Sequence, residues 1–177
     1  MMVLVTGGSG SGKSAFAEDT VLQLDENGSH RIYIATMYPY DEESKKRVLR
    51  HRDMRKDKHF ETIECFTDIG SLEISPDSTV LLECMSNLVA NEMFMPEGAG
   101  EDTFDCVCKG IVSLKKQSAN LVIVTNEIFS EAQIYEGDTS IYMENLGKIN
   151  QFCAEMADLV YEVVYGIPVM QKGVLGK

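Results

Sequence analysis

A phosphate-binding motif near the start of the chain constrains its fold more than any other feature. Residues 7–14 read GGSGSGKS and match the pattern G-x-x-x-x-G-K-[ST] of the P-loop. The apolar run Met2–Thr6 precedes the motif, and a helix-compatible stretch from Lys13 to about Leu24 follows it. A strand, a glycine-rich loop and a helix in this order predict a phosphate site rather than a flexible Gly/Ser turn.

The chemistry of this motif gives each of its residues a role. Glycines let the backbone approach an anion, so that successive N–H groups and the positive end of the next helix bind phosphate oxygens. We expect Lys13 to reach the β- and γ-phosphates and the Ser14 hydroxyl to hold Mg²⁺. The predicted phosphate-binding residues are Gly7, Gly8, Ser9, Gly10, Ser11, Gly12, Lys13 and Ser14.

Strands and helices are predicted to alternate along the rest of the chain. Strands are expected at residues 31–36, 61–66, 79–83, 120–125 and 159–164, and helices at 42–55, 84–95, 103–118 and 141–156. Gly166–Pro168 is predicted to end the last strand, and residues 128–140 show no clear periodicity. The alternation predicts one α/β domain over residues 1–177, with a mostly parallel sheet flanked by helices as in RecA-like P-loop NTPases.

Polar residues follow two of the predicted strands. Glu83 ends an apolar run that resembles a Walker B strand, although Asp is the usual ending. The carboxyl ends of parallel strands form the ligand-facing edge of a sheet, so we predict that Glu83 contacts the nucleotide or its Mg²⁺. Asn126 and Glu127 follow the strand at residues 120–125, where they would sense a phosphate, hold a water or simply cap the next turn.

The distribution of charge limits the partners of the chain. A formal net charge of -12 disfavours general binding to nucleic acid or to an anionic membrane. No stretch approaches the length of a membrane-spanning helix, and five cysteines without a C-x-x-C pair favour a reduced, cytoplasmic setting. Eight of the sixteen Lys and Arg residues nevertheless lie in residues 45–58, the basic segment. Within it, His51 by composition alone is a surface histidine on a charged helix.

Several short segments, in their order along the chain, resemble one known family. They are Val5–Gly8 with Ser11–Ser14, Tyr33–Thr36, His51–Arg55, Leu81–Cys84, Val124–Glu127 and Gly147–Gln151. Over nearly its whole length the chain resembles the bifunctional adenosylcobinamide kinase/adenosylcobinamide-phosphate guanylyltransferase family of cobalamin biosynthesis. Such enzymes phosphorylate adenosylcobinamide with ATP or GTP. They then transfer GMP from GTP to that phosphate through a GMP-histidine intermediate, giving adenosylcobinamide-GDP.

The resemblance implies functions for particular residues. His51 matches the histidine that carries GMP, and the family implies a homotrimer that binds nucleotide and corrinoid substrates. Besides the P-loop, the implied GTP site contains Ile34, Ala35, Thr36, Arg52, Asp53, Met54, Arg55, Glu64 and Glu83. The basic segment then has a chemical meaning, because nearby cations help to keep an imidazole neutral and nucleophilic. Arg52 and Arg55 would also neutralise triphosphate oxygens.

The chain departs from the family pattern where arginines are usual. Gly10 occupies the position of a P-loop arginine, while Ile128–Phe129 and Ser140–Glu144 stand where the family has a Val-Gly pair and an arginine-containing segment. Because arginine is a natural phosphate ligand, three interpretations stay open. They are the bifunctional enzyme, a P-loop kinase for another small alcohol in which His51 is inert, and a non-catalytic nucleotide-binding protein.

Overall fold

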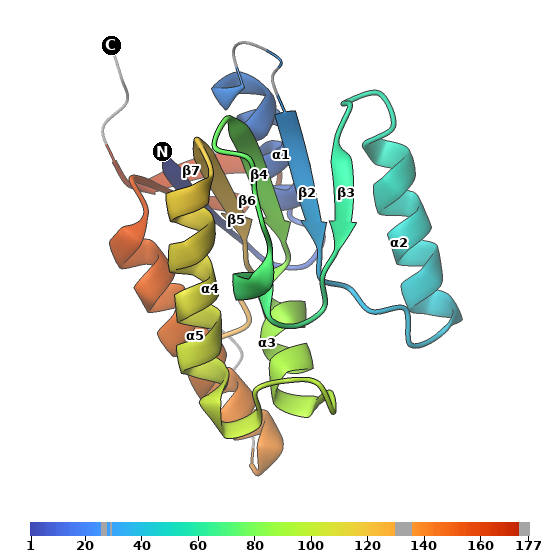
Figure 1. The fold of residues 1–177 in the computed structure, drawn as a ribbon, viewed down its shortest axis with the longest axis vertical. Helices are drawn as coiled ribbons and strands as arrows, with labels where there is room; N and C mark the ends of the chain where they lie inside the picture. The colour runs from blue at the N-terminus through green and yellow to red at the C-terminus, as the bar shows by residue number, and fades with distance from the viewer. Residues whose placement is uncertain (26–27, 29, 130–135, 174–177) are drawn as a thin grey trace.

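The computed structural model describes residues 1–25, 28, 30–129 and 136–173, and the side chains of Arg47, His51 and Met54 lie outside this described part. Its centre is a seven-stranded sheet of order β3-β2-β4-β5-β1-β6-β7 (Figure 1). The strands are β1 (Met2–Thr6), β2 (His30–Ala35), β3 (Glu61–Glu64), β4 (Ser78–Glu83), β5 (Asn120–Val124), β6 (Leu159–Val164) and β7 (Ile167–Lys172). β7 pairs antiparallel with β6, and the other pairings are parallel, so the predicted mostly parallel sheet is confirmed.

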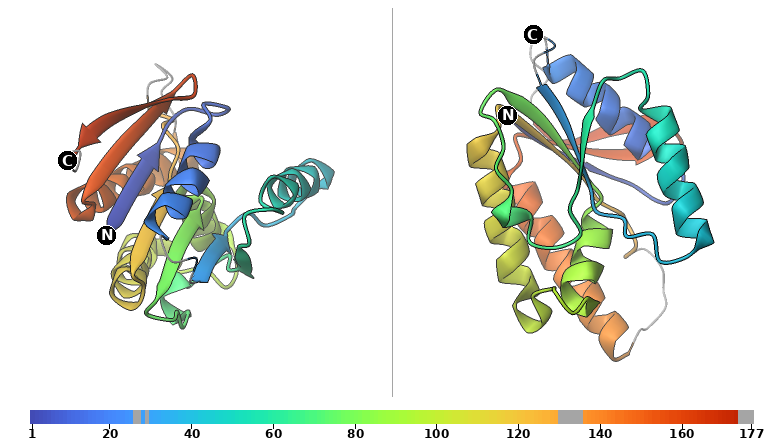
Figure 2. Two further views of the ribbon diagram at one scale, coloured as in Figure 1. Left: turned by 90° about the horizontal axis from the view of Figure 1, so that it is seen from above. Right: turned by 45° about the vertical axis from the view of Figure 1, so that its right-hand side comes forward.

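Helices cover both faces of the sheet. They are α1 (Lys13–Leu24), α2 (Glu42–Met54), α3 (Met85–Phe94), α4 (Thr103–Gln117) and α5 (Asp138–Met156), with short 3₁₀ helices at Ile69–Ser71 and Gly100–Asp102. The helices α3, α4 and α5 pack on one face, and α1 packs on the other. Helix α2 instead lies outside the sheet, beside the edge strand β3 (Figures 1 and 2). None of the described helices is long and apolar enough to cross a membrane.

The two cores follow from the alternation of side chains along each strand. In β1, Met2 and Leu4 join the cluster under α3, α4 and α5, whereas Val3 and Val5 join the cluster under α1. All four side chains are at most 3% exposed. A strand buried on both faces must be apolar at every position, which is why the central strands are continuous apolar runs.

The register of the parallel strands brings the predicted site residues to one edge. Val5 is paired with Val124, and Val124 with Glu83, so β1, β4 and β5 end at the same level. The P-loop that follows β1, the carboxylate of Glu83 and the loop that follows β5 are therefore neighbours. This convergence confirms the arrangement expected from the order of the strands.

Strand β6 ends at Val164, before the predicted stop at Gly166–Pro168, but the prediction that it is the last strand was wrong. Tyr165 and Gly166, with φ of 51° and 79°, form a two-residue turn, and Ile167–Lys172 returns as β7. Two left-handed residues in succession are typical of a tight hairpin turn. Pro168 fits into β7 because β7 is an edge strand, where a missing N–H donor costs little. The helix predicted from residue 141 begins earlier, at Asp138.

Candidate active site

The P-loop connects β1 to α1 and packs against the β6–β7 hairpin. The N–H of Gly166 donates to the carbonyl of Ser11 at 2.8 Å. A Cβ added to Gly12 would lie 3.3 Å from the Cα of Gly166, and Gly12 has φ of 92°. This position therefore requires glycine, both for the left-handed backbone and for the close approach of the hairpin. The β6–β7 hairpin therefore supports the P-loop, the predicted phosphate-binding loop.

Lys13 is the cation at the centre of the loop. Only 8% of the residue is exposed, and its Nζ donates to the carbonyl of Gly8 at 3.0 Å. Burial lowers the pKa of Lys13, while the neighbouring Cys84 and Glu83 act in the opposite direction. An ammonium group has three donors, so a phosphate group beside it would add partners and favour its charged form.

Ser14 and Glu83 meet as predicted from the motif and from the end of β4. The Ser14 hydroxyl donates a hydrogen bond to Oε1 of Glu83, whose residue is 8% exposed. A hydroxyl and a carboxylate are the hard oxygen ligands that Mg²⁺ prefers, so the pair fits this ion. In the described ranges, no group of three or more His, Cys, Asp or Glu side chains is arranged to hold a metal. Mg²⁺ here would therefore need phosphate oxygens and water as further ligands.

A cleft of about 750 Å³ opens over the P-loop. It lies between the loop, residues 43–50 of α2 and the start of α3, and its size suits a nucleotide-sized ligand. The cleft is lined by Ser9, Gly10, Ser11, Gly12, Lys13, Ser14, Ala15, Met37, Glu43, Lys46, Arg50, Glu83, Cys84, Asn87 and Asn126. Asn126 lines this cleft; the sequence alone did not decide whether it contacts a ligand or caps a turn. Glu127 accepts a hydrogen bond from the N–H of Phe129 at 2.9 Å and so caps the next turn.

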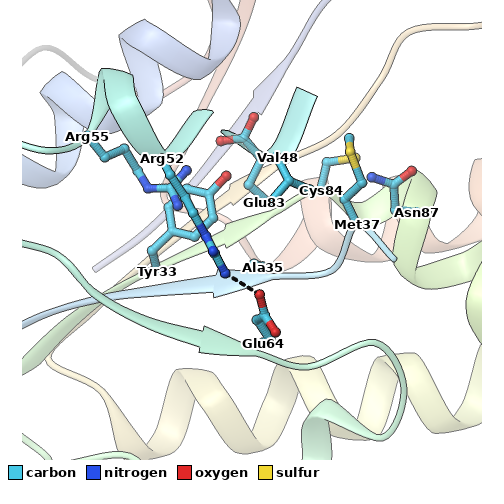
Figure 3. Close-up of a pocket in the computed structure, with 10 residues that line it drawn as sticks. All are labelled: Tyr33, Ala35, Met37, Val48, Arg52, Arg55, Glu64, Glu83, Cys84 and Asn87. Atoms are coloured by element: carbon cyan, nitrogen blue, oxygen red, sulfur yellow. Dashed lines mark hydrogen bonds and ion pairs between the residues drawn. The ribbon is translucent and has the colours of Figure 1, made fainter. Parts of the chain in front are cut away.

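A second pocket adjoins the cleft and shares part of its wall (Figure 3). It is lined by Tyr33, Ala35, Met37, Val48, Arg52, Arg55, Glu64, Glu83, Cys84 and Asn87. An ion pair between Arg52 and Glu64 connects α2 to β3 across this pocket (Figure 3). Both side chains are about half exposed, so the pair positions the two groups more than it stabilises the fold.

Arg55 is the most buried of the described cations in the basic segment. The residue is 5% exposed, and its guanidinium carbon lies 3.4 Å from the centre of the Tyr33 ring. Such stacking offsets part of the cost of burying a charge. Its Nη1 is buried without a hydrogen-bond partner among the described residues. A buried donor without an acceptor is costly, and an oxygen of a bound ligand would satisfy it.

The implied ligand residues of β2 differ in what they contact. Ala35 lines the second pocket, whereas the side chains of Ile34 and Thr36 are fully buried. The Thr36 hydroxyl donates to the carbonyl of Cys84 and accepts from the N–H of Cys84, both at 2.8 Å. Thr36 therefore holds the end of β4 and positions the neighbouring Glu83. Burial, followed by the charge of Glu83, raises the pKa of Tyr33, so its phenol stays protonated.

The remaining implied residues lie on α2. The Asp41 carboxylate caps this helix by accepting the Ser44 N–H at 2.7 Å. The side chains of His51 and Met54 lie outside the described part of the structure, and Asp53 is exposed and lines neither pocket. The backbone of α2 nevertheless locates His51 between Arg50, which lines the cleft, and Arg52, which lines the second pocket.

Fold and site together define a P-loop nucleotide-binding protein with a mostly parallel sheet. The fold is similar to that of a solved ATPase domain, with a TM-score of 0.56 and 11% identity; the match covers 99% of this chain and 78% of that chain. The chain belongs to the cobinamide kinase / cobinamide phosphate guanyltransferase family, which it matches over residues 3–170. The resemblance inferred from the sequence is thereby confirmed.

Two relatives carry the name bifunctional adenosylcobalamin biosynthesis protein CobU. One is from Salmonella typhimurium and the other from Escherichia coli, and each is 33% identical to this chain. Both matches cover 97% of this chain and 100% of the relative. The similarity therefore extends over the whole length of both proteins and is not limited to the P-loop.

Proposed function

We propose that this chain phosphorylates adenosylcobinamide with a nucleoside triphosphate and then transfers GMP from GTP to adenosylcobinamide phosphate. The main support is a single juxtaposition in the described residues. Lys13, Ser14 and Glu83 line one wall of the cleft, and the helix that carries His51 faces them. Phosphoryl transfer and attack by a histidine would thus use adjoining parts of one site.

In the kinase step, the alcohol oxygen of the corrinoid would attack the γ-phosphorus while the nucleoside diphosphate leaves. Such reactions depend mainly on positioning and on neutralisation of charge. Lys13 would neutralise the β- and γ-phosphates from the floor of the cleft. Ser14 and Glu83 would hold Mg²⁺, which when bound neutralises negative charge that develops on the phosphates.

In the transfer step, a neutral imidazole of His51 would attack the α-phosphorus of GTP and expel pyrophosphate. The phosphate oxygen of adenosylcobinamide phosphate would then attack the resulting GMP-histidine and release the free imidazole with adenosylcobinamide-GDP. A covalent intermediate divides one difficult displacement into two easier ones. Arg52 and Arg55 lie within four residues of His51 and would favour its neutral form.

A kinase without the transferase step is the second candidate, because the replaced arginines are phosphate ligands that one of the two activities would need. With Gly10 in the loop, one cation that the family usually has there is absent from this chain. The homotrimer that the family implies is also part of the proposal. It predicts a mass in solution of three times the 19.7 kDa of one chain, measurable by light scattering.

The mass of the intact protein after incubation with GTP and Mg²⁺ tests the transferase. We expect an acid-labile addition of one GMP on the native chain and none on His51→Ala. His30→Ala is the matched control. His30 begins β2 at the amino ends of the parallel strands, away from the P-loop, and there it contacts Glu61 and Ser78. This variant should accept GMP as the native chain does. If native protein that binds GTP gains no GMP, the transferase is refuted and only the kinase activity is left. That activity is tested by the phosphorylation of cobinamide, which Lys13→Ala should lose.

A further inference from the structure

Helix α2 presents a second pair of cations to the P-loop cleft. Lys46 and Arg50 both line the cleft together with residues 9–15 of the P-loop. Four residues apart, they lie one turn from each other on the same face of the helix. Arg52 and Arg55, further along α2 and just after it, line the second pocket instead. The basic segment therefore supplies cations to two different cavities.

The described residues of the protein provide no partner for this pair. Among the described residues, neither Lys46 nor Arg50 takes part in an ion pair or a side-chain hydrogen bond. Lys45, the preceding residue, is by contrast paired with Glu42 at 2.7 Å. Cations that line a cavity without an anionic partner favour an anionic ligand.

The charges around the cleft identify the chemistry of that ligand. Among the side chains that the structure describes, its cations are Lys13, Lys46 and Arg50, and its acids are Glu43 and Glu83. Glu83 contacts Ser14 in the expected Mg²⁺ site, so its charge is engaged there. A triphosphate carries several negative charges, of which one lysine and one Mg²⁺ neutralise only part.

We propose that Lys46 and Arg50 bind the β- and γ-phosphates of a nucleoside triphosphate that the P-loop holds. This inference rests on the proposed function. Lysine acts as a mobile point charge, whereas the arginine fork binds two oxygens at once. The pair forms a cationic wall facing Lys13 and supplies charge that Gly10 does not. Both are positioning residues for the polyphosphate, not for the base or the ribose.

Binding of three ligands tests this assignment. Isothermal titration with GTP, inorganic tripolyphosphate and GMP, each with Mg²⁺, compares the native chain with Lys46→Ala, Arg50→Ala and the double variant. We expect each single variant to weaken GTP and tripolyphosphate by about tenfold, the usual loss for one charge-assisted contact, and GMP by less than about twofold. Equal weakening of all three ligands would overturn the assignment to the β- and γ-phosphates.

Lys45→Ala is the matched control, because it removes the same charge from the neighbouring position on α2. It should bind all three ligands like the native chain. A loss equal to that of Lys46→Ala would mean that the general field of the helix attracts the polyphosphate, and the specific contact would be refuted. Arg50→Lys should recover part of the affinity lost in Arg50→Ala, and circular dichroism checks that α2 is retained in every variant.

The failure of this inference and that of the proposed function are distinguishable. If the double variant binds GTP like the native chain while the native chain still forms the GMP adduct and phosphorylates cobinamide, only the role of Lys46 and Arg50 is wrong. If the native chain shows neither activity, the proposed function fails. The contrast between tripolyphosphate and GMP then still decides whether the pair binds polyphosphate.

Discussion

Replacement of Lys58 tests how the end of the basic segment is held to α1. Its Nζ lies 2.8 Å from Oε2 of Glu18 and 3.1 Å from Oδ1 of Asp19. The Glu18 side chain is 1% exposed, whereas that of Asp19 is 61% exposed. Removal of one partner of a buried pair costs about 3 kcal/mol, because the other charge stays buried without compensation. We therefore expect Lys58→Met to lower the free energy of unfolding by about 3 kcal/mol.

Urea denaturation followed by circular dichroism measures this loss and separates the two carboxylates. Asp19→Asn, the control on the same lysine, should cost less than about 0.5 kcal/mol because an exposed ion pair contributes little. Glu18→Gln combined with Lys58→Met should recover most of the loss, since an amide needs no counter-ion. The reasoning is refuted if Lys58→Met stays within about 1 kcal/mol of the native protein, or if the double variant is no more stable than Lys58→Met.

Three further predictions concern pH, the P-loop and Arg55. Burial lowers the pKa of Lys58, but the hydrogen bonds to Glu18 and Asp19 outweigh burial and raise the pKa overall. The charged pair should therefore stabilise the fold below about pH 10 and lose this effect as the pH rises further. The urea midpoint of the native chain should fall over this pH range, and that of Lys58→Met should change less. Gly12→Ala should cost about 1–2 kcal/mol for its left-handed backbone, whereas Gly8→Ala, whose added Cβ meets nothing within 4 Å, should unfold like the native chain. Arg55→Met should weaken GTP binding measured by titration. It should change the unfolding free energy by about 1 kcal/mol or less, since only the stacking on Tyr33 is lost. A large loss of stability with native GTP affinity would contradict a ligand role.

The sequence predicted those parts of the site that depend on local patterns. The P-loop glycines and the apolar runs before them are contiguous signals, and the register of parallel strands follows once the strands are known. The contact between Ser14 and Glu83 was therefore predictable although 69 residues separate the two. The hairpin of β6 and β7 was not, because Tyr165-Gly166 is not a typical turn pair and Pro168 looked like a strand end. Only the pairing of β7 with β6 shows that this proline lies on an edge.

The contacts of the cations in the basic segment could not be predicted from the sequence, although the family resemblance gave Arg52 and Arg55 a role. The sequence alone does not distinguish the surroundings of Lys45, Lys46, Arg52 and Lys58. A charged helix by itself predicts a solvated surface. Their roles depend on how α2 is rotated against β3 and the P-loop, which is a tertiary property. The stacking of Arg55 on Tyr33 is likewise a long-range contact that no spacing rule indicates.

The structure divides the basic segment into cations that hold α2 in place and cations that are left for ligands. Helix α2 lies outside the sheet, and none of its described side chains belongs to either buried core, so hydrophobic packing of those side chains does not hold it. Arg52 connects it to β3 and Lys58 fastens the following turn to α1. Lys46 and Arg50, in the middle of α2, have no such partner in the described residues and face the P-loop. A helix that ion pairs hold near its C-terminal end, and whose central cations face the phosphate site, is expected to depend on bound polyphosphate for its full stability. Hydrogen exchange along Glu42–Met54 should therefore slow on addition of tripolyphosphate in the native chain, and not in the variant that lacks both Lys46 and Arg50.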